Sequence, residues 1–359
     1  MADSKQAPLD SAAAAKAAFA SVQDKPFPDD IFTAPELRWA VIGCGVIANQ
    51  MAQSLALAGR KLAGVANRTL SKAQAFAEQY GIEKVYESVE DLYADPGIDA
   101  VYITTPHNTH ITYLRDALAA GKHVLCEKAI TLNSAELDEA RAIADEHNVV
   151  LMDATTVLHM PLYQELRRRM DAGEFGRMNL AQLNFGSYKE YGDLTNRFYN
   201  RNLAGGAMLD IGVYALSVMR LFMASQPIEV VSLGNTCETG VDVAGGIVCR
   251  NAEQQLGVVS LTLHSKQPKR SIISFDKCYI EVNEYPRADH ATIVWTADGH
   301  REEVHAGTEA YALCYEMADL EKAVAGDDSK RELLDYASDV MELMTKFRAD
   351  WGVVYPEEE

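Results

Sequence analysis

A lysine, an aspartate and a tyrosine are the residues of this sequence whose chemistry is easiest to place. Lys128 follows a short apolar run at 123–126, and the carboxyl ends of such strands are where ligands bind in parallel sheets. Asp210 and Tyr214 are four residues apart in a helical stretch, so their side chains share one face. Brought together, an ammonium, a carboxylate and a phenol can orient a hydroxyl group and transfer its proton. The alternative for Lys128 is a surface ion pair with Glu127.

A glycine-rich turn predicts a dinucleotide site. A short apolar run is followed by Gly-Cys-Gly-Val-Ile-Ala at 43–48 and then by helix-forming residues. In this arrangement Gly43 permits the tight turn, Gly45 lets the backbone approach a pyrophosphate, and Ala48 keeps helix and strand close. The free N–H groups at the start of the helix favour the phosphates. The other interpretation is a tight turn that holds no ligand.

The end of the second expected strand bears on the choice of cofactor. Where an NAD-binding chain carries an acidic residue for the ribose 2′-hydroxyl, this chain has Asn67 and Arg68. A guanidinium suits a 2′-phosphate, and Lys72 adds charge one turn into the next helix. The sequence therefore predicts NADP as the preferred cofactor. NAD is the alternative, with Arg68 stacked on the adenine.

The elements that position these residues fall into two groups, of which the first covers 37–156. Apolar strand-like runs alternate there with helical segments, which predicts a parallel sheet with helices on both faces. Ligands bind at the carboxyl ends of such strands. The residues that we expect at those ends are Gly43, Asn67, Thr104, Glu127 and Asp153.

The second group, at 157–359, has a different pattern. Alternating polar and apolar residues predict strands over 179–187, 228–233, 245–249, 257–264, 271–275, 279–282 and 292–296. These stretches indicate an open, mostly antiparallel sheet with one helix-covered face. The expected fold class is α/β, with an N-terminal Rossmann dinucleotide-binding domain and a C-terminal α/β domain that binds the substrate.

Residues 1–36 form an arm ahead of the glycine turn. Asp10 or Ser11 is placed to cap an alanine-rich helix that runs to about Val22, before two prolines break the pattern. The arm is either a loose tail or a segment packed on a neighbouring subunit. In the second case its apolar anchors are Phe19, Phe27, Ile31 and Phe32.

Composition narrows the partners and the compartment. The formal net charge of −19 argues against nucleic acid or an anionic membrane as a partner. No apolar run reaches the roughly 20 residues that span a bilayer. The six cysteines are scattered and no signal pattern is present, which predicts a cytoplasmic protein with free thiols. We expect no metal site, because His159 and His264 have no ligand partners at a suitable spacing.

Four motifs together resemble those of the glucose–fructose oxidoreductase/inositol dehydrogenase/MocA (Gfo/Idh/MocA) family. They are the glycine turn, Thr-Pro-His-Asn-Thr-His at 105–110, Glu-Lys at 127–128, and Gly-Gly-x-x-x-Asp-x-Gly-x-Tyr at 205–214. The turn at 239–242 is also similar, and the likeness covers nearly all of 37–356. The resemblance implies a second domain whose open sheet commonly forms the oligomer interface, hence a homodimer or homotetramer.

Tyr214, where other members have histidine, resembles the glucose–fructose oxidoreductase and dihydrodiol dehydrogenase branch. Those members act on pyranoses or trans-dihydrodiols, usually with NADP. Three positions depart from the branch pattern. Ala129 stands for proline, Thr156 for tryptophan and Leu158 for arginine, which changes one cofactor contact and the pocket wall.

The resemblance and the residues together give a set of candidate site residues. The cofactor-binding candidates are Gly43, Gly45, Val46, Ile47, Asn67, Arg68, Lys72, Thr104, Thr105, Pro106, His107, His110, Glu127 and Lys128. The substrate-binding candidates are Lys128, Tyr188, Arg197, Asp210 and Tyr214.

The expected reaction is reversible hydride transfer between nicotinamide and a hydroxyl or carbonyl carbon of a sugar, polyol or cyclic diol. We expect Lys128 and Tyr214 to transfer the proton jointly, and Asp210 to orient the substrate hydroxyl and Lys128. Burial and a positive nicotinamide are expected to lower the pKa of Lys128, and its ammonium to favour tyrosinate at Tyr214. Two alternatives remain, a non-catalytic nucleotide-sensing regulator and a glycosidase that uses bound NAD transiently.

Overall fold

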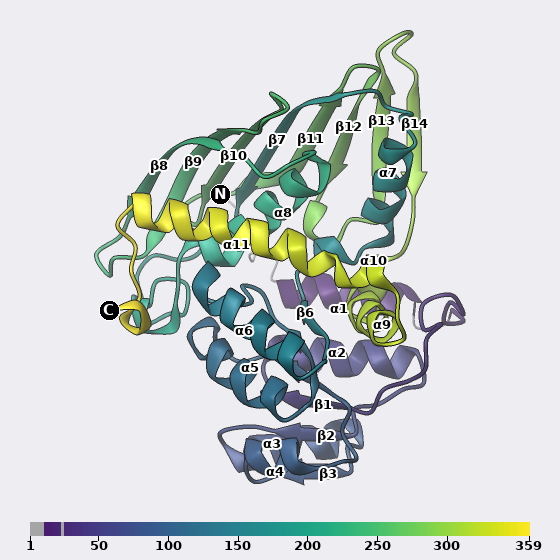
Figure 1. Ribbon diagram of the computed structural model, residues 1–359, viewed down its shortest axis with the longest axis vertical. Coiled ribbons are helices and arrows are strands. Elements are labelled where there is room, and N and C mark those ends of the chain that lie inside the picture. The colour runs from purple at the N-terminus through teal and green to yellow at the C-terminus, as the bar shows by residue number, and fades with distance from the viewer. Residues whose placement is uncertain (1–10, 23–24) are drawn as a thin grey trace, which may run out of the picture.

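The computed structural model describes residues 11–22 and 25–359, and the statements below refer to these (Figure 1). Helix α1 (Ser11–Val22) forms as the alanine-rich pattern predicts. The expected cap at Asp10 and the rest of residues 1–10 lie outside the described residues.

The first sheet has six parallel strands in the order β3-β2-β1-β4-β5-β6. Its strands are β1 (Trp39–Ile42), β2 (Gly64–Ala66), β3 (Lys84–Tyr86), β4 (Ala100–Ile103), β5 (His123–Cys126) and β6 (Leu151–Asp153). Strands β1 and β4 are buried along their whole length, because helices cover both faces. This order is that of a Rossmann domain, as predicted.

The helices of this half follow the expected start and stop signals. They are α2 (Val46–Leu57), α3 (Leu70–Tyr80), α4 (Val89–Ala94), α5 (His110–Ala119) and α6 (Ser134–Glu146). The side chain of Asn133 caps α6 by accepting the N–H of Glu136. Gly81 ends α3 in the left-handed conformation with φ +66°.

The second sheet has eight strands in the order β14-β13-β12-β11-β7-β10-β9-β8. Its strands are β7 (Met178–Gly186), β8 (Glu229–Thr236), β9 (Asp242–Arg250), β10 (Leu256–Thr262), β11 (Gln267–Phe275), β12 (Cys278–Asn283), β13 (His290–Trp295) and β14 (Arg301–His305). Only β7 and β10 run parallel, so the sheet is mostly antiparallel as expected. Strand β14 is an addition to the predicted set, since its charged sequence hides it.

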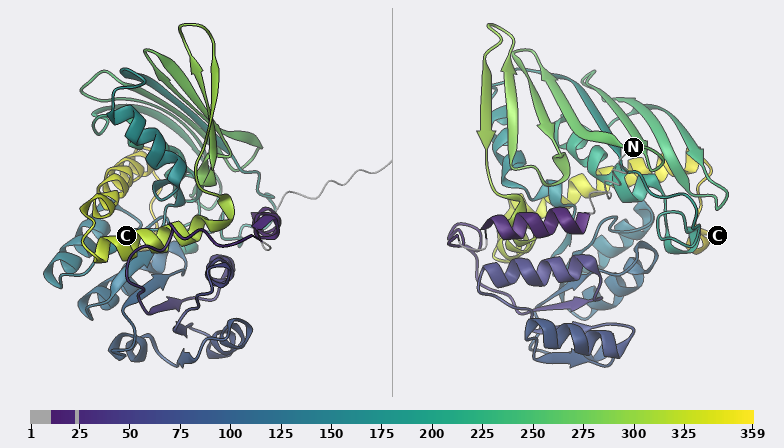
Figure 2. Two further views of the ribbon diagram at one scale, coloured as in Figure 1. Left: turned by 90° about the vertical axis from the view of Figure 1, so that its right-hand side faces the viewer. Right: turned by 180° about the vertical axis from the view of Figure 1, so that it is seen from behind.

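Helices cover one face of this sheet and leave the other open (Figure 2). The covering helices are α7 (Pro161–Asp171), α8 (Val213–Phe222) and α11 (Leu333–Asp350). Helix α11 runs between the two halves and contacts both α8 and α6 (Figure 1). On the open face Val231 and Leu233 are 74% and 81% exposed.

The stretch Arg201–Phe222 corrects one expectation. It consists of a short helical turn, the Gly-Gly turn and a helical segment that ends with α8, and it is long and apolar enough to cross a membrane by length and composition, although no such run was expected. However, 78% of its apolar window is buried inside the protein. Its composition is therefore that of a helix in the core of the second half, where α8 packs against β7.

The arm packs against its own chain. Ile31 is 4% exposed within the core, and the ring of Phe27 lies 5.0 Å from that of Tyr311. The guanidinium of Arg60 lies 4.0 Å from the centre of the Phe32 ring. Helix α1 lies beside α2 (Figure 2). The described part of the arm is therefore a packed segment rather than a loose tail, and Phe27, Ile31 and Phe32 contact this subunit itself.

Helix α9 (Ala312–Val324), which follows the second sheet, returns to the first half. It packs against α2, and its buried Glu321 accepts hydrogen bonds from the Leu37 N–H at 3.1 Å and the Trp39 Nε1–H at 3.0 Å. The expected domain boundary at 156/157 falls in a single turn, η2 (Thr156–Leu158). Helix α9 thus joins the C-terminal half to the start of β1.

Candidate active site

The glycine turn has the geometry that a pyrophosphate requires. Gly43 has φ +104°, and a Cβ there would lie 2.5 Å from Thr104 Oγ1. A Cβ on Gly45 would meet no atom within 4 Å, so the space above the turn is open. Helix α2 begins at Val46, which is 64% exposed, and has no acidic residue in its first turn. These residues fit an NAD(P) pyrophosphate at a helix N-terminus.

The turn after β2 presents two cations to solvent. Arg68 and Lys72 are both exposed, and neither forms an ion pair within residues 11–22 and 25–359. The Asn67 side chain holds the turn, because its Nδ2 donates to the carbonyl of Thr69 at 3.0 Å. The two cations are therefore free to bind a ribose phosphate.

The loop after β4 holds its backbone by internal hydrogen bonds. Thr109 donates from Oγ1 to Thr105 Oγ1 at 2.8 Å, and Pro106 precedes a short turn. Burial, aided by the charge of Lys128, lowers the pKa of His107 to about 3, so this ring is neutral. Its Nδ1 lies 3.4 Å from the carbonyl of Ala204, which leaves Nε2 for a ligand.

His110 differs from its expected role beside the cofactor. It is fully buried, and its ring nitrogens lie 3.0 Å from the Ala129 carbonyl and 2.8 Å from the Thr105 carbonyl. Both nitrogens are thus occupied by backbone. The ring ties the loop after β4 to the loop that carries Lys128, and it offers no polar atom to a cofactor.

Lys128, Asp210 and Tyr214 lie together, although they come from separate halves of the chain. Lys128 Nζ donates to the Asp210 carbonyl at 2.7 Å and to Asp210 Oδ1 at 3.2 Å. It also lies 5.0 Å from the centre of the Tyr214 ring. The Lys128 and Asp210 side chains are 12% and 13% exposed. The structure therefore builds one ammonium–carboxylate–phenol group at the ends of β5 and α8.

The Asp210 carboxylate is positioned by a π-helical turn, η4 (Met208–Gly212), which leads directly into α8. Asp242, fully buried at the start of β9, accepts the Met208 N–H at 2.6 Å. Gly206 leaves room for this carboxylate, because a Cβ there would lie 2.3 Å from Asp242 Oδ1. The Gly-Gly motif thus serves the approach of β9 to the turn that carries Asp210.

The protonation states correct the expectation for Lys128 and Tyr214. Burial alone would lower the pKa of Lys128, but the neighbouring groups, the Asp210 carboxylate foremost, together outweigh it and the pKa is raised. Burial raises the pKa of Tyr214, and the Lys128 ammonium does not reverse this. Burial would also raise the pKa of Asp210, but Lys128 and Arg197 hold it well below its ordinary value. At neutral pH the group is therefore ammonium, carboxylate and phenol.

Glu127 is not the partner of Lys128. It accepts a hydrogen bond from the buried Tyr102 hydroxyl, and burial raises the pKa of Glu127. Glu316 of α9 is fully buried nearby, and burial and the Glu127 carboxylate raise its pKa well above the ordinary value. The alternative of a surface ion pair at residues 127–128 is therefore wrong.

The two expected substrate residues outside this group behave differently. Arg197 Nη2 donates to Asp210 Oδ1 at 3.1 Å, and the Arg197 side chain is 61% exposed. Tyr188 is 56% exposed, and no hydrogen bond or ring contact joins its side chain to Lys128, Asp210 or Tyr214 in the described chain. The structure brings Arg197 into the site and leaves Tyr188 at its margin.

Sequence reasoning missed Lys189, which directly follows Tyr188. Its ammonium lies 4.1 Å from the centre of the Phe198 ring, and Arg197 lies 4.8 Å from the same centre.

The three residues that depart from the branch pattern, Ala129, Thr156 and Leu158, are all buried beside the site loops. Among residues 11–22 and 25–359, no three His, Cys, Asp or Glu side chains are grouped to hold a metal ion.

Comparison with known proteins fits this geometry. Residues 37–155 match the oxidoreductase family with an NAD-binding Rossmann fold, and 163–281 match the GFO/IDH/MocA C-terminal domain. The chain belongs to the Gfo/Idh/MocA family. It is an NAD(P)-dependent oxidoreductase acting on CH–OH groups, and its relatives lie in the dihydrodiol dehydrogenase branch.

The relatives are similar over much of their length. A trans-1,2-dihydrobenzene-1,2-diol dehydrogenase of Mus musculus is 32% identical over 254 residues, which cover 69% of this chain and 75% of the relative. The enzyme of the same name from Sus scrofa is 28% identical over 340 residues, which cover 90% of this chain and 99% of the relative. Among solved structures, levoglucosan dehydrogenase with NADH and levoglucosan is 19% identical with a TM-score of 0.76, covering 87% of this chain and 97% of that one. A 3-ketoreductase of Actinomadura kijaniata with NADP and TDP-benzene is 24% identical with a TM-score of 0.75, and the match covers 88% of this chain and 98% of that one. These structures share the fold.

Gly45→Ala tests the pyrophosphate cradle. Because the added methyl meets no protein atom, we expect the melting temperature to stay the same while the Kd for NADP rises at least about tenfold. Gly246→Ala is the matched control, since a Cβ there also meets nothing within 4 Å. Calorimetric titration with NADP measures both variants. Unchanged affinity in Gly45→Ala would place the cofactor elsewhere.

Proposed function

We propose that this protein is an NADP-preferring dehydrogenase that interconverts a secondary hydroxyl and a carbonyl group on a sugar, polyol or cyclic diol. The observation that supports it is the Lys128 ammonium in contact with the Asp210 carboxylate and the Tyr214 ring. The first experiment is turnover with a panel of aldoses, polyols and trans-diols, followed at the absorbance of NADPH. A protein that binds NADP tightly yet is inert toward every compound would contradict the proposal.

The protonation states suggest how the residues act. Lys128 and Tyr214 both keep their protons at neutral pH, so either can donate to the oxygen of a substrate carbonyl during reduction. Asp210 holds the Lys128 ammonium by two hydrogen bonds and fixes its direction. Nicotinamide, when bound, exchanges a hydride with the substrate carbon. In the direction of oxidation, Lys128 first loses its proton and then accepts that of the hydroxyl.

The preference for NADP rests on Arg68 and Lys72, which are exposed and without an ionic partner within the described chain. A planar guanidinium binds a phosphate by paired, charge-assisted hydrogen bonds. The names of the relatives support catalysis over the regulator alternative, as do the retained Lys128 and Asp210. The glycosidase alternative differs in outcome, because it would release a free sugar without net change in the nicotinamide.

The open sheet face supports a homodimer or homotetramer. Val231 pairs with Val248 across β8 and β9, so both side chains point to the same face, and Leu233 follows two residues later on that face. Val231, Val248 and Leu233 are 74%, 47% and 81% exposed, and contiguous apolar surface of this kind typically marks an interface.

The six cysteines, all in the described part of the chain, are free thiols and support a cytoplasmic location.

Arg68→Ala tests the cofactor preference. Because the guanidinium would bind only the 2′-phosphate, we expect KM for NADP to rise about 10- to 100-fold while KM for NAD changes little. Arg177→Ala, an exposed arginine of the second half, is the control. Equal losses for both cofactors would show that Arg68 contacts the adenine instead.

Asp210→Asn tests the proton transfer. The carboxylate raises the pKa of Lys128, so its removal lets burial lower that pKa. For oxidation, which needs neutral Lys128, the rising limb of kcat/KM against pH moves to lower pH by about one unit, with kcat reduced at least tenfold. If the limb of the pH profile does not move in Asp210→Asn, Lys128 is not the group that titrates.

Lys128→Met removes the ammonium altogether, and we expect it to lower kcat by about 10³-fold or more.

Leu233→Lys tests the open face. A lysine there adds like charge at the centre of a symmetric contact, so we expect light scattering to show a dimer or tetramer for the wild type and monomers for the variant. Val354→Lys changes an apolar residue that is 41% exposed outside this sheet, and it should leave the mass unchanged. A monomeric wild type would refute the interface.

A further inference from the structure

The site holds more positive than negative charge. A single carboxylate, that of Asp210, has its pKa lowered by three cations, Lys128, Arg197 and Lys189. His107 adds no charge, because its ring is neutral. Asp210 accepts from Lys128 at 3.2 Å and from Arg197 at 3.1 Å, so it already serves two cations. Lys189 has no ion pair among residues 11–22 and 25–359. Three cations therefore face one carboxylate, and Lys189 is the cation without an ion pair in the described chain.

Lys189 and Arg197 share a contact with one aromatic ring, that of Phe198. Both lie over the Phe198 ring, at 4.1 Å and 4.8 Å from its centre. Each also has unused hydrogen-bond donors, since the Arg197 fork has five N–H groups and spends one on Asp210. Their charges repel each other, since the Arg197 guanidinium lowers the pKa of Lys189, and a bound anion would offset that repulsion.

The backbone fixes Lys189 in this place. The Lys189 N–H donates to the Leu263 carbonyl at 2.7 Å, which extends the pairing of β7 and β10 beyond the strands. Its carbonyl accepts the Tyr199 hydroxyl at 2.9 Å. The lysine is thus fixed at the end of two central strands, β7 and β10. Burial lowers the pKa of Lys189, and Arg197, Lys128 and Lys269 lower it further, while the Asp210 carboxylate opposes them without reversing the shift.

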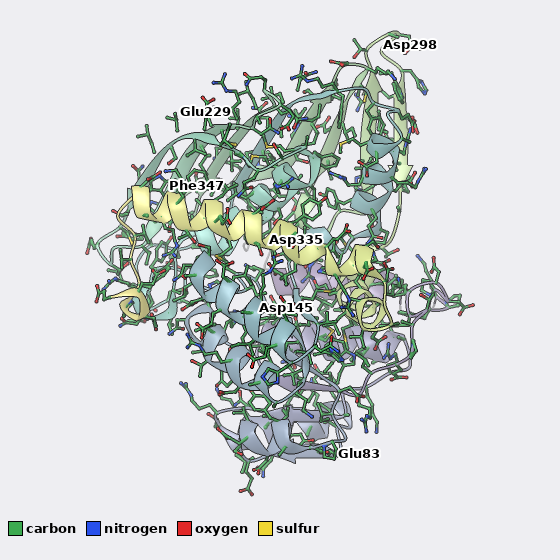
Figure 3. All side chains as sticks on the ribbon, in the orientation of Figure 1. Glu83, Asp145, Glu229, Asp298, Asp335 and Phe347 are labelled. Carbon is green, nitrogen blue, oxygen red and sulfur yellow. The ribbon has the colours of Figure 1, made fainter. Side chains whose placement is uncertain are left out.

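This charge contrasts with the rest of the molecule. The chain carries a net charge of −19, and its acidic residues lie on the surface of both halves, as Glu83, Asp145 and Asp298 show (Figure 3). An acidic surface repels anions in general, so a local cluster of cations selects for an anion at one point. An oxidised nicotinamide would add a further positive charge to the same place.

We propose that the substrate carries an anionic group, a carboxylate or a phosphate, that binds between Lys189 and Arg197 while its reacting carbon lies beside Lys128. This inference rests on the proposed dehydrogenase function and names the class of its substrate. An acidic sugar or a phosphorylated sugar meets the requirement. A neutral diol leaves Lys189 without a partner.

The test measures binding by calorimetry to the full chain saturated with NADP⁺. The ligands form two series, glucose, glucuronate and glucose 6-phosphate, and galactose, galacturonate and galactose 6-phosphate. We expect a carboxylate or a phosphate member to bind at least about tenfold more tightly than its neutral parent, with affinity falling as salt rises. The two charged members tell a carboxylate site from a phosphate site. Neutral members that bind as well as, or better than, both charged ones overturn the proposal.

Variants locate the contact. Lys189→Gln and Arg197→Gln should each reduce the preference for the charged member about tenfold or more, while Lys266→Gln, an exposed lysine between β10 and β11, should keep it. An equal preference in all three variants would place the anion elsewhere and overturn the assignment. Tight binding of an anion without hydride transfer would refute the dehydrogenase function and keep the anion site.

Discussion

The contact between Lys128 and Asp210 is the interaction on which the site depends. Lys128 follows β5 of the parallel sheet, and Asp210 lies in the turn ahead of α8, beneath the second sheet. Neither half has the pair alone, so the packing of the halves through α8, α9 and α11 sets its geometry. The buried Asp242 carboxylate and the Gly-Gly turn hold the Asp210 segment against β9. Hydride-transfer chemistry needs this rigidity, because a displaced ammonium no longer meets the substrate oxygen.

Electrostatics at the site is a competition between burial and neighbouring charge. Burial opposes the charged form of Lys128 and is the largest single influence on its pKa, but the neighbouring groups, with the Asp210 carboxylate 3.2 Å away foremost, together outweigh it, and the lysine stays an ammonium. At Tyr214 burial dominates, and at Glu127, which lacks a cation at hydrogen-bonding distance, burial dominates too. The result is two protonated groups, the Lys128 ammonium and the Tyr214 phenol, beside the fixed Asp210 carboxylate. This arrangement suits protonation of a carbonyl oxygen at neutral pH and removal of a hydroxyl proton at higher pH.

The fold and the main site residues could be predicted because each depends on local patterns. Apolar runs, glycine turns and helix caps such as Asn133 predicted the elements of the Rossmann half. The alternation of polar and apolar residues predicted most strands of the second half. Strand β14 was missed because its charged residues lie at a sheet edge. Lys189 was missed because its role comes from the Phe198 ring and Arg197, a spatial grouping that spacing does not reveal. The protonation of Lys128 was predicted wrongly because the sequence shows burial but not the distance to Asp210.

A crystal structure of the protein with NADP⁺ bound tests the central claim most directly. The measured quantity is the position of the nicotinamide ring relative to Lys128 Nζ, Asp210 and the Tyr214 hydroxyl. The account predicts that the pyrophosphate lies on the turn at Gly43 and Gly45, with the ring packed beside Lys128 and room for a substrate between them. A nicotinamide outside reach of Lys128, or a pyrophosphate away from the start of α2, would contradict it.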